Sequence, residues 1–516
     1  MENGSENIIK ALEKEGVEVC FTNPGTSELH LVEALGQSEN IKSVLCLFEG
    51  VVTGAADGYA RMSGKPAATL LHLGPGFANG IANMHNAQKA NSPMVNLVGQ
   101  HALTHLEHET PLHSDIMGLA KPVSGWVETI FSNNDIFPCM TEAIANTKKP
   151  YNRISTVIIP ADIAWSKSKE IPVGSSAYVP DSIDKDIVNI VADILLKAKH
   201  PVIFVNTTGL DKACIDLIGK IQKKIGCRIF SELFVSRLTK GAGEVVVERI
   251  PFRQKEALKV FENVDEAILV GAHHPRTFFA YPGQSSSSMF MPDCRVTCLV
   301  GVDRFSYDVI KALVTELGAD DLMPDLSPAK TLKCADGELT TEKVGQSIAA
   351  LLPESAIISD DGITSTFNYW PLFVHAPRHD WLYTTGGAIG QGLPVAVGAA
   401  IAEPQRPVIC LSGDGSAMYT IQSLWTQVRE NLNIVNIIYS NRSYKILNTE
   451  LTLIGIDDIG ETGKQMLDLS KPNLNFVDMA SSMGMSAICV SNMEAFNNAM
   501  KQAIQSDRPN LIEVLC

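Results

Sequence analysis

The chain has 516 residues, of which 45% are hydrophobic and 19% are charged, and its net charge is −15. This composition is typical of a well-packed globular protein and excludes a disordered chain. The acidic balance and the scattered basic residues argue against nucleic acid or an anionic membrane surface as a partner.

The compartment is indicated by the cysteines and by the N-terminus. Eleven cysteines without a Cys-x-x-Cys pair indicate free thiols in a reducing environment. The N-terminal residues lack the apolar core of a signal peptide, and no apolar run approaches the roughly 18 residues of a membrane span. We therefore expect a soluble cytoplasmic protein without a membrane segment.

Short β-rich runs alternate with helix-length segments along the whole chain. Helices are predicted at residues 53–61, 187–198 and 421–430. Strands are predicted, in chain order, at residues 18–21, 68–72, 94–98, 156–159, 202–205, 267–270, 296–300, 356–358, 408–411, 434–439 and 511–515. Most of these strands are continuous apolar runs, as in parallel strands that helices cover on both faces. The pattern predicts an α/β fold with three doubly wound parallel-sheet domains.

Two polar stretches, rich in Pro, Ser, Lys and Asp, divide the chain at residues 166–186 and 318–343. Such segments favour domain boundaries because few contacts cross them. We expect domains at residues 1–168, 186–325 and 340–516, in line with about 150 residues per domain.

An acid between two glycines follows the strand predicted at residues 408–411. Asn441 lies 27 residues beyond Asp414, after one helix and one more strand. In a right-handed βαβ unit both residues lie just past the carboxyl ends of parallel strands. Carboxylate and amide oxygens there suit Mg²⁺, which also retains phosphate oxygens as ligands. Gly413 and Gly415 would let the backbone approach a diphosphate and adopt positive φ, although a plain strand-to-helix turn is the alternative.

The segment GDGSAMY, followed by Asn441, resembles the diphosphate-binding motif of thiamine-diphosphate-dependent enzymes. By that resemblance the cofactors are thiamine diphosphate and Mg²⁺, and the metal ligands are Asp414, the Asn441 side chain and the Ser443 carbonyl. The three domains would be pyrimidine-binding, central and diphosphate-binding. The residues implied to bind the cofactor are Gly387, Ile389, Gly413, Asp414, Gly415, Ser416, Asn441, Ser443 and Tyr444.

The segment LCLFEGVVTGAADGYARMSGKPAA resembles the part of this family that carries its catalytic acid. The resemblance implies that Glu49 hydrogen-bonds N1′ of the aminopyrimidine and promotes removal of the proton from C2 of the thiazolium. This role needs a carboxyl in a dry pocket that can exchange a proton with a weakly basic nitrogen. The alternative is an ordinary glutamate at a helix N-terminus, where the helix dipole favours it.

The segment TTGGAIGQGLPVAVGAAIAEP, at residues 384–404, resembles the loop and helix that bracket the aminopyrimidine ring. The resemblance implies that the Gly387 carbonyl accepts from the 4′-amino group and that Ile389 holds the cofactor in a bent conformation. The bend brings the 4′-imino nitrogen near C2, which is a proximity effect. Core packing is the alternative role for Ile389.

Two further segments resemble benzoylformate decarboxylase. FTNPGTSELHLVEAL places Thr26 at the position of an active-site serine, and ATLLHLGPGFANGIANMHNA places His72 at the position of a catalytic histidine. A second histidine of that enzyme falls near Phe278 here, so we expect one proton-transfer group to be missing. A hydrogen-bonded core histidine is the alternative for His72.

The resemblance implies a carboxy-lyase or a carboligase that acts on a 2-oxo acid. The leading interpretation is non-oxidative decarboxylation through a C2 ylid and an enamine, as in benzoylformate decarboxylase. GPGFANGIAN instead resembles acetolactate synthase, so a carboligase is the alternative, although the central domain shows no convincing flavin-binding signature. A non-catalytic cofactor-binding relative is disfavoured because Glu49, Asp414 and Asn441 are all present. The 2-oxo acid itself stays open.

Glu49 and Asp414 lie in different domains, yet both must contact one cofactor. In the family this is solved between subunits, which implies a homodimer, or a homotetramer built as a dimer of dimers, with sites at the subunit interface. Four histidines, His101, His105, His108 and His113, gather in one segment. A polar loop near the mouth of the pocket is favoured there over a metal site.

Overall fold

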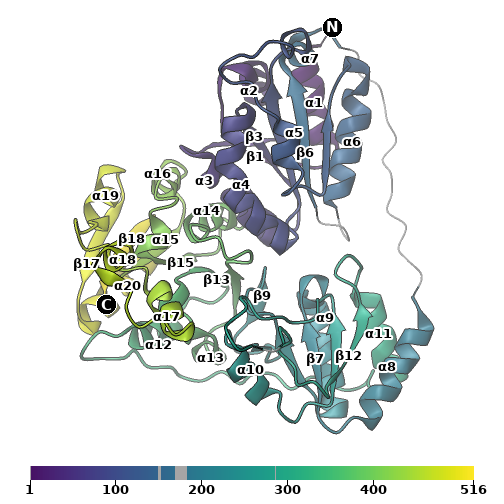
Figure 1. Ribbon diagram of the computed structural model, residues 1–516, viewed down its shortest axis with the longest axis vertical. Coiled ribbons are helices and arrows are strands. Elements are labelled where there is room, and N and C mark those ends of the chain that lie inside the picture. The colour runs from purple at the N-terminus through teal and green to yellow at the C-terminus, as the bar shows by residue number, and fades with distance from the viewer. Residues whose placement is uncertain (1, 149–152, 169–182, 285) are drawn as a thin grey trace.

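The computed structural model describes residues 2–148, 153–168, 183–284 and 286–516. Three β-sheets, each accompanied by helices, form three lobes (Figure 1). The predicted α/β class with three doubly wound, parallel-dominated sheets is therefore confirmed. The linker predicted at residues 166–186 falls largely outside the described residues, so this boundary stays a prediction. No helix in the described ranges is both long and apolar enough to cross a membrane.

The first sheet has six parallel strands in the order β2-β1-β3-β4-β6-β5. They are β1 (Val19–Asn23), β2 (Lys42–Leu45), β3 (Ala67–Leu71), β4 (Met94–Gln100), β5 (Trp126–Thr129) and β6 (Ile154–Pro160). Their helices are α1 (Gly4–Lys14), α2 (Leu29–Gln37), α3 (Glu49–Ser63), α4 (Leu73–Ala90), α5 (Ile116–Ala120), α6 (Ile136–Thr147) and α7 (Ala161–Trp165). Val19 and Phe21 of β1 enter one hydrophobic cluster and Cys20 another, so both faces of this sheet are covered.

The central sheet has five parallel strands in the order β10-β8-β7-β11-β12. They are β7 (Pro201–Val205), β8 (Arg228–Ser231), β10 (Glu248–Arg249), β11 (Glu266–Val270) and β12 (Arg295–Val300). The helices of this part are α8 (Lys185–Lys197), α9 (Lys212–Ile225), α10 (Gln254–Val260) and α11 (Tyr307–Glu316).

The third sheet has seven strands in the order β17-β18-β16-β15-β13-β14-β9. They are β9 (Leu238–Lys240), β13 (Ala356–Asp361), β14 (His379–Tyr383), β15 (Val408–Gly413), β16 (Ile434–Ser440), β17 (Ser486–Val490) and β18 (Asn510–Leu515). Its helices are α12 (Thr341–Leu351), α13 (Tyr369–Leu372), α14 (Gly392–Ala402), α15 (Asp414–Ala417), α16 (Ser423–Arg429), α17 (Lys445–Leu453), α18 (Gly460–Leu467), α19 (Phe476–Ser482) and α20 (Met493–Gln505). Only β9 pairs antiparallel in the described sheets, and it comes from the stretch between β8 and β10.

Each of the eleven predicted strands overlaps a strand of the structure. The sequence prediction missed β2, β5 and β17, which lie at sheet edges and contain exposed residues. An edge strand needs little apolar sequence, because one side of it meets solvent. It also missed β8, β9, β10 and β14. In β14 the buried carboxylate of Asp380, which is paired with Arg237 and Arg406, breaks the apolar run.

The helix predicted at residues 421–430 is shorter than expected. After Asp414 the chain forms only the single turn α15, and the next helix, α16, begins at Ser423. The intervening turn is held elsewhere, because the Thr420 hydroxyl donates to the Gly390 carbonyl at 2.8 Å. The predicted helix is therefore present, but it begins two residues later and ends one residue earlier than predicted.

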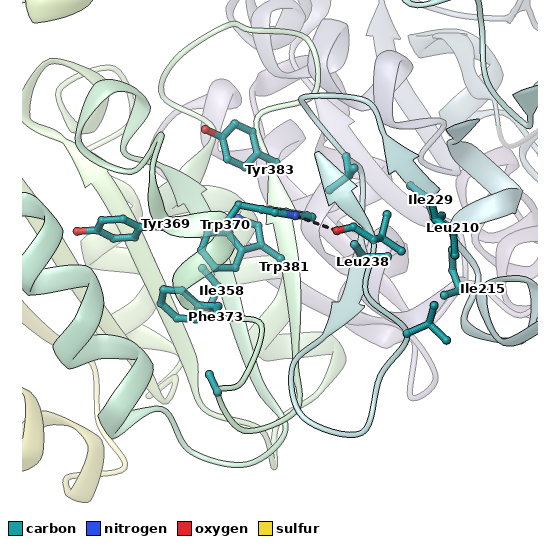
Figure 2. Close-up of a cluster of buried hydrophobic side chains, with 14 of the residues drawn as sticks. Leu210, Ile215, Ile229, Leu238, Ile358, Tyr369, Trp370, Phe373, Trp381 and Tyr383 are labelled. Carbon is teal, nitrogen blue, oxygen red and sulfur yellow. Dashed lines mark hydrogen bonds between the residues drawn. The ribbon is translucent and has the colours of Figure 1, made fainter. Parts of the chain in front are cut away.

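The central and third parts of the chain share one hydrophobic core. Figure 2 shows Trp370, Phe373 and Trp381 from the third part on one side of Leu238 in β9, with Ile229 of the central sheet on the other. The Trp370 indole donates to a central-domain carbonyl, that of Val247, at 3.1 Å. These two parts therefore fold against each other rather than as separate bodies.

The first and third domains meet through α3 and α14. A Cβ atom added at Gly58 would overlap the Val395 carbonyl, and one at Gly398 would overlap the Ala55 carbonyl. The two helix backbones therefore touch, which only small residues allow. This contact fixes the two cofactor-binding domains relative to each other within one chain.

A buried histidine lies in the strand that joins β9 to the third sheet. His379 is 1% exposed, and its Nδ1 lies 2.7 Å from the Pro377 carbonyl. Burial, followed by the charge of Lys240, lowers the pKa of His379 to about 3. The folded chain therefore keeps this ring neutral at pH values where the unfolded chain protonates it.

Protonation of His379 is expected to oppose folding in acid. The unfolded chain takes up the proton below pH 6.5, so stability falls from there towards pH 3, by up to about 1.4 kcal/mol per pH unit from this group. In His379→Phe, which keeps an aromatic ring against Phe373 and Trp381, the melting temperature should fall less between pH 6.5 and 5. An equal fall in both proteins would contradict the assignment.

Candidate active site

Functional groups of the first domain meet at the carboxyl edge of its sheet. Ser27 and Glu28 follow β1, Glu49 follows β2, and His72 follows β3. These three strands are neighbours, in the order β2-β1-β3. Because parallel strands share one carboxyl edge, the groups line a single rim, where ligands of doubly wound sheets bind.

Glu49 is the first residue of α3, as the sequence predicts, and is 7% exposed. Asn79 in α4 donates from Nδ2 to Glu49 Oε2 at 3.0 Å. No basic side chain forms an ion pair with Glu49 in the described part of the chain. The carboxyl group therefore lies in largely dry, uncharged surroundings, which suit proton exchange with a weakly basic ring nitrogen.

His72 forms a pair with a buried acid that the sequence prediction missed. Its Nδ1 lies 2.8 Å from Oε2 of Glu28, whose side chain is fully buried, and 3.2 Å from the Ser27 hydroxyl. Glu28 also accepts from the Gly25 amide at 3.0 Å. A carboxylate at Nδ1 holds the proton on that nitrogen and leaves Nε2 for a substrate. The predicted hydroxyl, Thr26, is exposed, and Ser27 is the hydroxyl beside the ring.

The second rim is the carboxyl edge of the third sheet. β15 and β16 are parallel neighbours, with Gly413 opposite Tyr439, so Asp414 and Asn441 leave adjacent strands as the sequence predicts. Asp414 is 3% exposed and accepts from the amides of Gly415, at 2.8 Å, and Arg442, at 2.5 Å.

Burial raises the pKa of Asp414, and no ion pair neutralises it within the described residues. A buried carboxylate that lacks a cation is costly, and a bound divalent ion removes that cost. The Asn441 amide oxygen, which accepts from the Ser443 amide at 2.9 Å, adds a second oxygen donor at this edge. The donor set fits Mg²⁺: Asp414, Asn441 and the Ser443 carbonyl would hold the ion, with phosphate oxygens as further ligands.

The backbone of this edge differs from the prediction in one respect. Gly413 has φ of −73°, and Gly415 is not among the residues with positive φ, so the expected positive φ at these two glycines is wrong. Arg442 has it instead, at +57°, where its amide reaches Asp414. Gly415 is needed for space: a Cβ there would lie 2.6 Å from the Tyr444 ring. Ser416 is buried in α15.

The loop between β14 and α14 carries Gly387 and Ile389, both half-buried. Gly387 has φ of +76°. The Asp361 carboxylate accepts from the amides of Gly390, at 2.8 Å, and Gln391, at 3.1 Å, and so caps α14. Burial raises the pKa of Asp361 to about 7. One end of the loop is thereby fixed to β13 of the third sheet.

The central domain contributes an aromatic ring to this loop. A Cβ added at Gly387 would lie 2.8 Å from the Phe278 ring. Phe278 also contacts Phe234 and Phe252, at ring distances of 5.5 and 5.9 Å. His274, four residues before Phe278, lies 3.0 Å from the Ser288 hydroxyl. Phe278 therefore presents an apolar ring to the Gly387 loop.

The four clustered histidines follow β4, at the same edge as His72. Consecutive rings contact one another: His101 and His105 are 5.7 Å apart, and His105 and His108 are 5.3 Å apart. His113 pairs with Glu109 at 3.2 Å. In the described ranges no group of three or more His, Cys, Asp or Glu residues could hold a metal ion.

Doubly wound sheets that carry a buried acid at one rim and oxygen donors at another are typical of enzymes that bind a cofactor at the carboxyl edges of their strands. The family model of the thiamine pyrophosphate enzyme N-terminal TPP binding domain matches residues 2–119, and the C-terminal TPP binding domain model matches residues 364–514. The chain belongs to the thiamine pyrophosphate enzyme family. It is therefore a thiamine-diphosphate-dependent enzyme, and such enzymes generally use Mg²⁺ alongside the cofactor.

Known relatives span the whole chain. It is 40% identical over 515 residues to a Mycobacterium tuberculosis protein named as an acetolactate synthase large subunit, IlvX, with 99% of each covered. It is 27% identical over 532 residues to benzoylformate decarboxylase of Pseudomonas aeruginosa, covering 98% of this chain and 97% of that one. The solved structure of a 4-hydroxybenzoylformate decarboxylase from Rhodococcus jostii RHA1 is 24% identical, with a TM-score of 0.87, and covers 100% of this chain and 99% of that chain.

Removal of the carboxylate at the third-sheet rim should abolish metal-dependent cofactor binding. We expect Asp414→Asn to weaken thiamine diphosphate binding in the presence of Mg²⁺ by about 100-fold or more, because the only charged side chain of the proposed ligand set is lost. Calorimetry on the metal-stripped protein, with and without added Mg²⁺, measures this. Asp458→Asn, which removes an exposed carboxylate of the same domain, is the matched control. Unchanged Mg²⁺-dependent affinity in Asp414→Asn would refute the assignment.

Proposed function

We propose that the chain is a carboxy-lyase that decarboxylates a 2-oxo acid without oxidation and releases an aldehyde. The observation that carries this proposal is the His72–Glu28 pair at 2.8 Å. Aldehyde release requires a proton at the carbon that has lost CO₂. A histidine whose Nδ1 is held by a buried acid presents Nε2 for that transfer.

The other site residues have separable roles in this proposal. When bound, thiamine diphosphate supplies the electron sink that accepts the electron pair left on the substrate when CO₂ departs. Glu49 holds and exchanges a proton at N1′ of the pyrimidine. The Gly387 carbonyl accepts from the 4′-amino group, and Ile389 supports the bent cofactor. Asp414, with its neighbours at the third-sheet rim, holds Mg²⁺ and through it the diphosphate.

We further propose that each site is shared between two chains in a homodimer, or in a homotetramer built from such dimers. Glu49 makes its hydrogen bond inside its own domain, to Asn79. Apolar side chains are exposed beside each rim: Leu47 is 47% exposed near Glu49, and Tyr419 is 54% exposed near Asp414. Burial of these side chains against a second copy would bring the two rims together and is favourable.

A carboligase of the acetolactate synthase type is the second candidate. The relative at 40% identity bears that name, and Phe278 supplies an apolar ring where a proton-transfer group would favour aldehyde release. If a second proton-transfer group is absent, the carbon that has lost CO₂ could react with a second 2-oxo acid or an aldehyde before it takes up a proton. Both candidates release CO₂, so the organic product separates them.

The proposed reaction is tested with a panel of 2-oxo acids, by trapping CO₂ and identifying the organic product. We expect one aldehyde per CO₂ from the best substrate, because His72 delivers the proton. A hydroxyketone as the main product would support the carboligase instead. Absence of CO₂ across the panel, despite tight cofactor binding, would mean that the chain is a non-catalytic relative.

Glu28 should control the later, substrate-dependent steps alone. We expect Glu28→Gln to lower kcat by about 10²-fold, because His72 loses the partner that fixes its proton on Nδ1. Cofactor affinity and hydrogen–deuterium exchange at C2 should be unchanged, since Glu28 does not serve the pyrimidine. Glu33→Gln, which removes an exposed acid of α2, is the matched control. Slowed exchange at C2 in Glu28→Gln would contradict this division of roles.

A further inference from the structure

A buried ion pair in the second half of α3 takes no part in the chemistry described above. Arg61 donates to both carboxylate oxygens of Asp57, from Nε at 2.8 Å and from Nη2 at 2.5 Å. The two side chains are 1% and 0% exposed. A bidentate pair of this kind is rigid, and its geometry depends on the planar guanidinium.

Besides bonds to the Ser92 hydroxyl and the Ser236 carbonyl, this pair contacts both ends of the loop that carries Gly387. Arg61 donates to the Tyr383 carbonyl at 2.7 Å and to the Thr385 hydroxyl at 3.0 Å, just before the loop. The Gln391 amide donates to Asp57 at 2.5 Å, just after it. The pair is therefore hydrogen-bonded to the segment at residues 383–391 near both of its ends.

A second set of contacts from the same domain supports this arrangement. Asn86 in α4 exchanges two hydrogen bonds with Ala388, at 2.8 and 3.1 Å, and His85 lies 3.1 Å from the Gly386 carbonyl. The loop conformation is thus set by the first domain of the same chain as well as by Asp361 of the third.

We propose that Asp57 and Arg61 are positioning residues that fix the Gly387 loop for the aminopyrimidine ring. This rests on the proposed function, in which that loop faces the cofactor bound at Asp414 of its own chain. Glu49, at the start of the same helix, then serves the cofactor of the partner chain. From Glu49 to Arg61 the helix rises about 18 Å, so α3 contributes to two different active sites at its two ends.

If Asp57 and Arg61 position the loop, the loss of their loop contacts should change how the cofactor is placed, and this effect can be measured separately from the stability of the fold. Arg61→Lys keeps the charge but loses the fork, and Thr385→Val removes one Arg61 contact without leaving a buried charge unpaired. At saturating thiamine diphosphate and Mg²⁺, both variants should slow exchange at C2 by about 10-fold or more, because a misplaced ring loses its proximity advantage. Calorimetry should also show weaker cofactor binding, by several-fold.

Arg237→Lys is the matched control. Arg237 also joins the first and third domains, through Asp380 and the backbone carbonyls of Arg61 and Met62, but it forms no hydrogen bond to the loop among the described residues. This variant should lower the melting temperature and leave exchange at C2 and cofactor affinity unchanged. If Arg61→Lys and Thr385→Val exchanged at the wild-type rate, or if Arg237→Lys slowed exchange as much as they do, the positioning role would be overturned.

Hybrid dimers show which of the two chains supplies the Arg61 that affects a given active site. A wild-type chain paired with a chain carrying Glu49→Gln and Arg61→Lys has one competent site, formed by the variant loop, and should be slow. An Arg61→Lys chain paired with a Glu49→Gln chain has one competent site with a normal loop, and should match a wild-type chain paired with Glu49→Gln. Slowing of both hybrids would overturn the positioning role. The reverse pattern, with only the second hybrid slow, would show that both halves of a site lie in one chain and would reject the proposed dimer instead.

Discussion

Contact between the backbones of α3 and α14 determines how everything else in this chain can be arranged. Gly58 lies against the backbone of Val395, and Gly398 lies against the backbone of Ala55, so the helix backbones meet at these two points. Helices that touch so closely have no room to slide or rock, because any side chain would have to be displaced first. The first and third domains are therefore held together within a chain at this contact.

The buried acids of the chain differ in how their charge is balanced, and the differences separate structural from functional positions. Asp57 is matched by the Arg61 guanidinium, and Glu28 by backbone and hydroxyl donors beside His72. Asp414 is also buried, yet the hydrogen bonds that it accepts within the described residues come from backbone amides. An acid in such a position is costly unless a cation joins it, which explains why a metal site is consistent with the fold at this point.

The sequence predicted the architecture well because buried parallel strands are apolar throughout, and all eleven predicted strands are present. Edge strands such as β17 were missed, since exposure on one side removes the apolar signal on which the prediction depends. Helix α16 begins later than predicted because a tertiary hydrogen bond from Thr420 to Gly390 holds the preceding turn. The periodicity of hydrophobic residues along the chain does not indicate such a tertiary contact.

The sequence predicted those residues of the candidate site that follow the carboxyl ends of parallel strands. Glu49, His72, Asp414 and Asn441 all leave the carboxyl ends of parallel strands, which follows from the order of elements. Glu28 was missed because a glutamate in a turn reads as exposed, and its burial comes from packing under His72. The sequence offered one signal, which is that Glu28 lies only two residues beyond Thr26, a residue already predicted to belong to the site.

The central claim is that one cofactor is held by Glu49 of one chain and Asp414 of another. Glu49→Gln and Asp414→Ala should each be inactive alone. After the two are mixed in equal amounts and their subunits exchange, half the dimers are hybrids with one intact site, so about a quarter of wild-type activity should return. The account predicts this recovery, together with a dimer or larger species in light scattering. No recovery after demonstrated subunit exchange, or an active monomer, would contradict it.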